Sequence, residues 1–592
     1  MKHLFPFIFL LAAGFPGLAQ YNPAITSGEL LQHISYLASD SLEGRLPGTK
    51  GDKLAAAYIR DHFQEAGLEL LYDDGYQSFD LISDIKPSPE CNFQLNNVSL
   101  QINTMYAPAL YSGNGTLASK VIFCGYGFAI QEDSLKWNDY QEIRPQGKWV
   151  MLLLGDPEID AVRSSFIPYS KDCTKVLTAI DNGAAGVLLV VPPSMEATDQ
   201  LPRQYFDRSG ASASIPVVYI TREAANRILQ GKGTIAELNE KLDRNRHPLS
   251  FETNTEITVT VQLDKTFSHT ANVVALLPGS DPGLSDEYLL VGAHFDHLGF
   301  GGPGSGSRMP DTMAVHNGAD DNASGVAAVI ELAQYFAAHT ARHPRSILFA
   351  AFTAEESGLV GSKYMARNLP VEKDKLMAMF NFDMIGRYNK EKGKISIGGT
   401  GTSLEADSLI DRALEGYTFG VAKSTDGYGP SDHASFYALD VPVFFISTGA
   451  HQDYHTPFDD VAAIDAIAAE AIARFSARLL QEVTTMEKPL SFQKTRSATG
   501  DSRSSMRLKV TLGIMPDMVS QNNDGLGVDG VRPGGPADKG GIVTGDRIVA
   551  INGERVTNIY SYMHRLGTLK PGETAVVEIV RNGKNEILLI QL

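Results

Sequence analysis

The chain has 592 residues, of which 43% are hydrophobic and 20% are charged, values typical of a soluble globular protein. This length is too great for one hydrophobic core and predicts about three domains. The formal net charge of −18 argues against nucleic acid and anionic membrane surfaces as partners. Because the chain has only three cysteines, at most one disulfide bridge can form, which excludes a disulfide framework.

Residues 1–19 are expected to be a secretory signal peptide. Lys2 precedes an apolar run, and the small residues Gly17 and Ala19 provide a cleavage site before Gln20. The run is too short for a comfortable membrane span, and no later stretch is long enough to cross a bilayer. We therefore expect an exported protein, periplasmic or secreted, without a stable membrane span after signal cleavage. The alternative is an uncleaved anchor.

Residues 20–90 and 255–485 are expected to form one α/β domain around an inserted module. Residues 25–68 have helical periodicity, interrupted by a turn that contains Gly and Pro. Residues 91–254 change to short apolar strands separated by Gly/Pro turns. The chain then returns to alternating strand and helix patterns, which predict a mostly parallel sheet with helices on both faces.

Within this domain, the apolar strand predicted over residues 288–293 leads directly into His294 and Asp296. Because residues two apart on a strand share a face, this imidazole and carboxylate are presented together where the strand ends. Open α/β sheets bind ligands at such ends. A Gly-rich loop then leads to Asp321, just before a helical pattern over residues 326–336.

Three further apolar strands also end beside charged or imidazole side chains. Residues 346–357 end in Glu355 and Glu356, residues 377–387 contain Asp383 at or near the strand end, and residues 441–448 precede a loop with His455. Adjacent buried carboxylates repel each other, so Glu355 and Glu356 need a compensating cation. Four strand ends that offer nitrogen and oxygen ligands predict a metal site.

The C-terminal part has a different character. Residues 486–506 are polar and rich in Ser, Lys and Arg, which predicts a linker. Residues 507–592 contain RLKVTLGIMPD and GPADKGGIVTGDRIVAINGERV and resemble a bacterial PDZ domain, a small β-rich fold. Such domains bind chain ends along a sheet edge, which implies a chain-end ligand at Leu512, Gly513 and Ile514. Alternatively, this domain only docks against the rest of the chain.

The chain resembles the co-catalytic zinc aminopeptidase family in six motifs that occur in the same order. These motifs are HFDH, GADDNASG, TAEESGLVGS, NFDMIGR, SDHASF and YHTPFDD. That family includes bacterial leucine-type aminopeptidases and is related to glutamate carboxypeptidase and the transferrin receptor. The resemblance implies two zinc ions per chain. His294 and Asp383 would hold one ion, Glu356 and His455 would hold the other, and Asp321 would bridge both.

Residues 91–254 resemble a protease-associated domain through GKWVMLLLGD and NGAAGVLLV. Such a module either walls the active-site cleft or acts as a spacer.

The chemistry of these residue types agrees with the implied roles. Two metal ions about 3.5–4 Å apart activate a bridging water and polarise a carbonyl, and Asp321 has the two oxygens that a bridge needs. Glu355 is implied as the general base and Asp296 as the partner that orients His294. Tyr454 is implied as the donor to the oxyanion, or else is a packed aromatic with a satisfied hydroxyl. Cobalt or manganese would suit the same ligands.

We therefore expect an exported metallo-aminopeptidase that hydrolyses N-terminal residues from peptides. A carboxypeptidase or dipeptidase on the same scaffold is the first alternative. A glutaminyl cyclase-like enzyme with one zinc and a non-catalytic receptor-like protein are the others. The full ligand set together with Glu355 favours hydrolysis over these last two.

Overall fold

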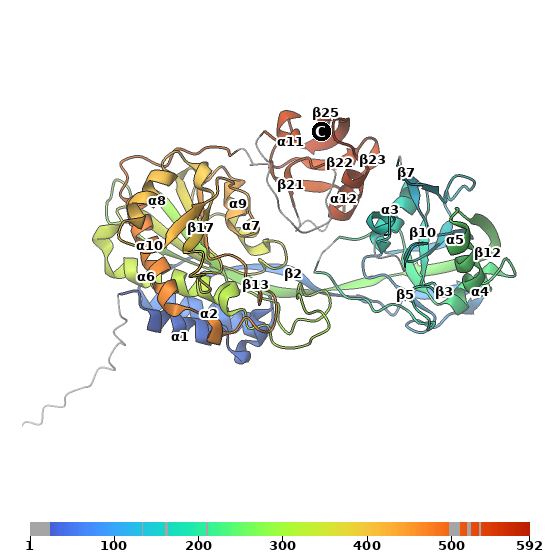
Figure 1. Ribbon diagram of the computed structural model, residues 1–592, viewed down its shortest axis with the longest axis horizontal. Helices are drawn as coiled ribbons and strands as arrows, with labels where there is room; N and C mark the ends of the chain where they lie inside the picture. Colours follow the sequence, from blue (N-terminus) through green and yellow to red (C-terminus); the bar gives the residue numbers. More distant parts are fainter. Residues whose placement is uncertain are drawn as a thin grey trace, which may run out of the picture.

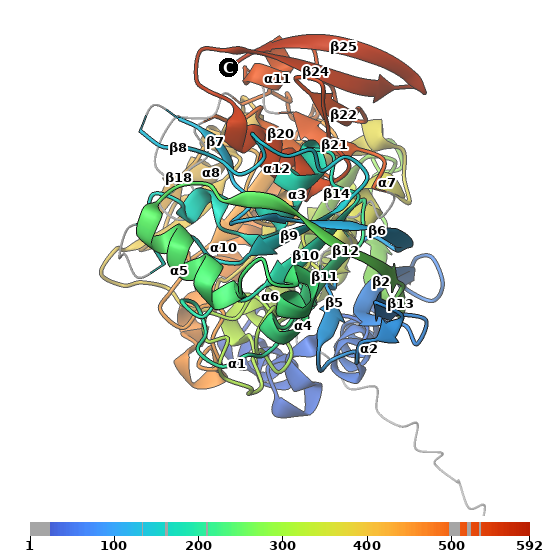
Figure 2. The same ribbon diagram turned by 90° about the vertical axis from the view of Figure 1, so that its right-hand side faces the viewer.

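The computed structural model describes residues 24–132, 134–159, 164–208, 211–495, 510–517, 523–531 and 534–592. The expected signal peptide and residues 496–506 of the expected linker lie outside these described residues. Figure 1 shows an α/β body joined to a β-rich body by two long strands, β2 (Tyr76–Pro87) and β13 (Leu263–Leu277). A third, smaller body lies above both, and the view in Figure 2 agrees.

The first sheet belongs to the α/β body and runs in the order β1-β13-β15-β14-β16-β19-β17-β18, with β2 also paired to β13. Its further strands are β1 (Glu69–Leu70), β14 (Tyr288–His294), β15 (Ser346–Phe352), β16 (Leu376–Phe382), β17 (Lys394–Gly398), β18 (Gly420–Lys423) and β19 (Val443–Ser447). The central run β15-β14-β16-β19 is parallel, whereas β13 and β17 pair antiparallel with their central neighbours. The predicted α/β fold is confirmed, with antiparallel strands added at the flanks of the parallel centre.

Helices cover both faces of this sheet, as the strand pattern predicts. One face packs against α1 (Ser27–Leu37), α2 (Lys50–Glu65), α6 (Gly325–Ala338), α8 (Ala406–Leu414) and α10 (Ala466–Thr484). The other packs against α7 (Val360–Arg367) and α9 (His433–Tyr437). Side chains of β14 alternate between the two cores: Leu289 and Val291 join the first, and Leu290 joins the second.

The second sheet forms the inserted module and runs in the order β4-β3-β12-β6-β9-β10-β11-β5. Its strands are β3 (Asn92–Leu95), β4 (Val98–Ser99), β5 (Tyr106–Pro108), β6 (Gly115–Cys124), β9 (Trp149–Leu153), β10 (Gly186–Val190), β11 (Val217–Ile220) and β12 (Ser250–Val261). Helices α3 (Asp172–Asp181), α4 (Arg222–Leu229) and α5 (Ile235–Asn245) accompany it, as does a separate pair, β7 (Ala129–Gln131) and β8 (Lys136–Asn138). The expected boundary at residue 254 falls inside β12.

The third sheet runs in the order β20-β21-β22-β24-β25, with β23 paired to β22. Its elements are β20 (Ile514–Pro516), β21 (Leu526–Val531), α11 (Pro536–Lys539), β22 (Arg547–Ile551), β23 (Glu554–Arg555), α12 (Ile559–Thr568), β24 (Thr574–Arg581) and β25 (Lys584–Gln591). This body contacts both others: Arg367 of α7 donates to Asp529 at 2.7 Å, and Arg565 of α12 pairs with Asp181 of α3.

Residues 486–495 of the expected linker pack against the α/β body. Leu490 is buried in its core, and the backbone N–H of Thr495 donates to the Tyr437 hydroxyl at 2.9 Å.

Cys91, Cys124 and Cys173 are free thiols. Within the described part of the chain, no helix is both long enough and apolar enough to cross a membrane.

Candidate metal centre

Four neighbouring strands deliver the candidate side chains to one edge of the first sheet. Strands β15, β14, β16 and β19 are adjacent and parallel, so their C-terminal ends lie together. His294 ends β14, Asp383 follows β16, and the loops after β15 and β19 carry Glu355, Glu356 and His455. The topology therefore brings distant parts of the chain to one place.

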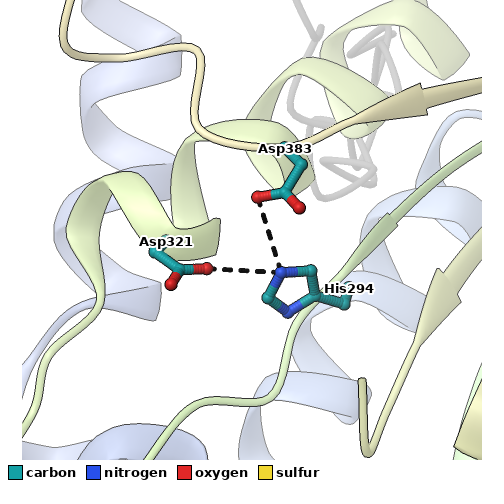
Figure 3. Close-up of side chains that lie close together, drawn as sticks. All are labelled: His294, Asp321 and Asp383. Carbon is teal, nitrogen blue, oxygen red and sulfur yellow. Dashed lines mark ion pairs between the residues drawn. The ribbon is translucent and has the colours of Figure 1, made fainter. Parts of the chain in front are cut away.

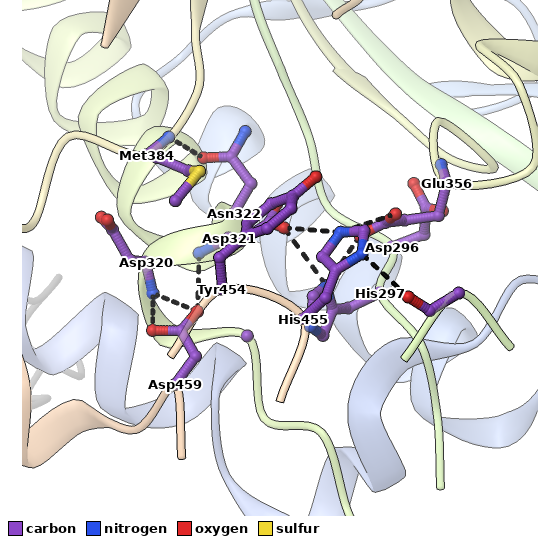
Figure 4. Close-up of polar contacts among 12 residues, drawn as sticks. Asp296, His297, Asp320, Asp321, Asn322, Glu356, Met384, Tyr454, His455 and Asp459 are labelled. Atoms are coloured by element: carbon purple, nitrogen blue, oxygen red, sulfur yellow. Dashed lines mark hydrogen bonds and ion pairs between the residues drawn. The ribbon is translucent and has the colours of Figure 1, made fainter. Parts of the chain in front are cut away.

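Asp321 lies between two histidines, in the kinked segment Ala319–Ser324 before α6, where its own backbone is not helical. Its Oδ1 is 3.3 Å from His294 Nε2, which is also 3.6 Å from Asp383 Oδ1 (Figure 3). Its Oδ2 is 3.2 Å from His455 Nε2, which is also 3.1 Å from Glu356 Oε2 (Figure 4). The five side chains thus form two groups that share Asp321.

The burial and chemistry of these two groups fit divalent metal ions. The five side chains are between 1% and 14% exposed. Three carboxylates at this density in a buried site repel one another unless cations accompany them. His455 Nε2 lies within 3.2 Å of two carboxylate oxygens, an arrangement that suits nitrogen and oxygen ligands of one cation. Imidazole nitrogen and carboxylate oxygen are ligands that zinc accepts.

Asp296 positions the turn that carries the two glutamates. Its Oδ1 accepts the backbone N–H of Glu355 at 3.0 Å, and its Oδ2 accepts that of Glu356 at 3.3 Å. Its expected pairing with His294 is longer, with 3.7 Å between Asp296 Oδ1 and His294 Nδ1. The sequence motif did not indicate the backbone contacts. Asp296 therefore links the end of β14 to the loop after β15.

Glu355 is partly buried and lies close enough to both groups for their charges to act on its carboxyl group. Burial, the largest effect, raises the pKa of its carboxyl group well above the usual value. The nearby His294 opposes this shift, whereas the carboxylates of Glu356, Asp432 and Asp383 add to it. A carboxyl group whose neighbours raise its pKa binds a proton more readily than an exposed glutamate does.

His297, the last residue of the HFDH motif, lies inside the centre. The side chain is fully buried, with Nδ1 2.9 Å from Glu356 Oε1 and 3.9 Å from Asp321 Oδ2 (Figure 4). A second supporting residue, Asp459, accepts the backbone N–H groups of Asp320 at 3.1 Å and Asp321 at 3.0 Å. Asp459, a residue of the YHTPFDD motif for which the sequence predicted no role, thus holds the turn that presents Asp321.

Tyr454 lies over the second group. Its ring stacks on the ring of His455, with 3.8 Å between the centroids (Figure 4). Burial raises the pKa of its hydroxyl well above the usual value, and the carboxylates of Asp321 and Glu356 add to the shift. The hydroxyl therefore stays protonated at neutral pH and is available as a hydrogen-bond donor.

Arg45 ties the two loops of the centre to the N-terminal helices. The side chain is fully buried and lies just after α1, in a stretch for which the sequence predicted helices and a turn. Its Nε donates to Phe295 O at 2.6 Å, its Nη1 to Asn317 O at 2.6 Å and its Nη2 to Gly318 O at 3.0 Å. One guanidinium thus joins the end of β14 to the segment before Asp321.

Arg45→Met is expected to lower the free energy of unfolding by at least about 3 kcal/mol, because several buried carbonyl groups lose a charged donor. Urea unfolding followed by circular dichroism measures the change. Arg60→Met on the exposed face of α2 is the matched control and is expected to change stability little. Equal stability of the Arg45 variant and the wild type would contradict this role.

The expected chain-end groove of the third body is only partly available. Leu512 is buried, and its carbonyl accepts the backbone N–H of Ala537 at 2.8 Å. The N–H of Gly513 already donates to the Thr511 hydroxyl at 3.0 Å, and Ile514 begins β20, which pairs with β21. Chain-end binding at these three residues stays a prediction.

Comparison with known proteins identifies two parts of the chain. Residues 272–480 match Peptidase family M28, and residues 510–592 match the PDZ domain family. The chain is 33% identical over 184 residues to leupeptin-inactivating enzyme 1 of Streptomyces exfoliatus, which covers 30% of this chain and 36% of that protein. It is 33% identical over 192 residues to an aminopeptidase of Pseudomonas aeruginosa, covering 31% of this chain and 32% of that protein.

The chain spans about a third of the length of these two relatives. Among solved structures, an aminopeptidase from Aneurinibacillus sp. strain AM-1 is similar over 79% of this chain and 95% of that one, at 20% identity and a TM-score of 0.48. The sequence motifs, the site at the strand ends and the two family matches all indicate the same two domains. Residues 272–480 of this chain are therefore a peptidase family M28 domain, and residues 510–592 are a PDZ domain.

Proposed function

We propose that the protein is an exported aminopeptidase that uses two zinc ions and Glu355 as general base to release N-terminal residues from peptides. The observation that carries the proposal is the position of Asp321 between the two groups. Its Oδ1 lies 3.3 Å from His294 Nε2, and its Oδ2 lies 3.2 Å from His455 Nε2. The names of the M28 relatives support the substrate class, because one is an aminopeptidase. The apolar N-terminal segment of the sequence supports export.

In this proposal, His294, Asp383 and Asp321 would hold one ion, and His455, Glu356 and Asp321 would hold the other. The two ions, when bound, supply Lewis acidity toward the scissile carbonyl and toward water. Glu355 takes a proton from the attacking water on its carboxylate and delivers it to the leaving amine. Asp296 fixes the backbone of Glu355 and Glu356 so that the base and the ligand keep their relative places.

Two further residues beside Glu356 and His455 assist the reaction. The Tyr454 hydroxyl donates a hydrogen bond to the oxyanion of the tetrahedral intermediate. His297 Nδ1–H donates to Glu356 Oε1, which leaves Oε2 directed toward His455. The inserted module, which resembles a protease-associated domain, contacts the Gly-rich loop after His297 through Arg208, whose Nη2 donates to Leu298 O at 3.4 Å.

Elemental analysis of the purified chain together with hydrolysis of paired peptides tests the proposal. We expect two metal ions per chain, and cleavage that is abolished by an amino-terminal block but not by a carboxyl-terminal block. Removal of the ions by a chelator should abolish hydrolysis, and added zinc should restore it. Cleavage that requires a free carboxyl end and tolerates a blocked amine would assign a carboxypeptidase instead. One ion per chain with release of ammonia from N-terminal glutamine would assign a glutaminyl cyclase.

A further inference from the structure

A narrow ribbon of two strands carries the chain from the α/β body into the inserted module and back (Figure 1). Strands β2 and β13 pair antiparallel along this ribbon, and their register shifts between Thr266 and Phe267. Residues 264–267 of β13 are exposed, so neither core covers the middle of the ribbon. A two-stranded ribbon is weak by itself, and a bulge bends it further. The ribbon alone therefore leaves the angle between the two bodies poorly fixed.

The PDZ domain is joined to the inserted module at two places. Arg565 of α12 forms a two-bond pair with Asp181 at the end of α3, with 2.6 Å between its Nη2 and Asp181 Oδ1. The backbone of Ser212 is bonded on both sides, because its carbonyl accepts from Asn558 Nδ2 at 2.8 Å and its N–H donates to Asn523 Oδ1 at 3.2 Å. Two-bond guanidinium–carboxylate pairs fix geometry as well as adding energy. The module is thus oriented relative to the PDZ domain.

The same PDZ domain is joined to the α/β body on another side. Arg367, the last residue of α7, bonds Asp529 at 2.7 Å and lies 3.0 Å from Asp517 Oδ2. Strand β21 also lies directly against Tyr428, because a Cβ atom on Gly530 would overlap the Tyr428 hydroxyl. The PDZ domain therefore connects the two bodies that the ribbon also connects.

The position of the inserted module matters because the module touches the Gly-rich loop that follows His297. Arg208 Nη2 donates to the carbonyl of Leu298 at 3.4 Å. A Cβ atom on Gly304 of the same loop would lie 3.0 Å from Phe206 O. A module that turned about the ribbon would leave this loop.

We propose that the PDZ domain is a strut that holds the inserted module against the Gly-rich loop beside the metal centre, and that release of either end of the strut lets the module turn about the β2–β13 ribbon. A partner that binds the PDZ domain and displaces either contact would then uncover that loop. Because a strut acts on the position of a domain, it can be tested without measuring peptide hydrolysis.

The test uses two charge reversals in the full-length chain. Asp181→Arg places a cation against Arg565 and breaks the module end, and Arg367→Asp places a carboxylate against Asp529 and breaks the other end. In each variant we expect hydrogen–deuterium exchange of residues 298–306 to rise by at least about 5-fold, because the module no longer covers them. The radius of gyration from small-angle X-ray scattering should increase. The double variant should exchange no faster than the faster single variant, since one broken end already frees the module.

Glu240→Arg is the matched control, because it reverses an exposed charge on α5 of the same module. It is expected to leave both measurements as in the wild type. Circular dichroism shows whether each variant is folded. If Arg367→Asp does not fold, Gly530→Leu breaks the same end by placing a side chain on the Tyr428 hydroxyl. If Asp181→Arg does not fold, Asp181→Ala removes the pair with Arg565.

Three results would overturn the strut. Unchanged exchange and an unchanged radius in both variants would mean that the ribbon alone fixes the module. A change in Asp181→Arg only would mean that the PDZ contact with the α/β body does not bear on the module. Exchange in the double variant that equals the product of the two single increases would mean that two independent contacts act on the loop.

Discussion

Replacing Glu355 with Gln is expected to lower kcat by about 10²- to 10⁴-fold while both metal ions stay bound, because the amide keeps the size of the side chain but cannot accept a proton. The backbone of residue 355 remains held by Asp296, so the neighbouring ligand Glu356 keeps its place. KM should change much less than kcat, since the base acts on water and not in substrate binding. Steady-state kinetics and elemental analysis of the same preparation measure both effects.

Glu356→Gln is the matched comparison, because it makes the same chemical change one residue further along. That variant is expected to lose metal, since Glu356 Oε2 faces His455 Nε2 at 3.1 Å as part of the second group. The two variants thus separate a base from a ligand. If Glu355→Gln loses metal and Glu356→Gln keeps it, the two roles are reversed. If both keep full activity, neither residue has the role assigned to it.

Asp321→Asn is expected to weaken metal binding at both positions by more than about 100-fold, since one side chain serves both groups. The amide has a single oxygen and no charge, and so cannot bridge two cations as a carboxylate does. Metal titration followed by calorimetry should show the loss of both binding steps, and hydrolysis should fall with them. Asp311→Asn, an exposed carboxylate of the same Gly-rich loop, is the control and should bind metal as the wild type does.

Loss of only one metal-binding step in Asp321→Asn would show that this residue belongs to a single group. The other group would then need a different shared ligand, and His297 is the nearest candidate, with Nδ1 2.9 Å from Glu356 Oε1. Retention of both steps would remove the basis of the two-metal proposal. Each result can be read independently of catalytic activity, because binding is measured directly.

The amino-acid sequence by itself determined the parallel centre of the first sheet and the side chains at its strand ends. The apolar runs at residues 288–293 and 377–387 predict β14 and β16, because burial on both faces leaves a continuous hydrophobic pattern that is local in sequence. The PDZ domain was equally recognisable, since its turns and strands carry a compact set of Gly and apolar residues. The domain boundaries and the resemblance of the inserted module to a protease-associated domain stay predictions.

Only the tertiary structure decided which distant groups support those strand ends. Arg45 contacts Phe295 from 250 positions away, and it binds backbone carbonyls, which any residue type presents and no side-chain pattern encodes. Asp459 likewise accepts backbone N–H groups. Arg208 lies in a segment without periodicity and meets Leu298 only because β2 and β13 carry the inserted module to that side. Periodicity follows from local geometry, whereas these contacts follow from how whole layers pack, and that information is not local in the sequence.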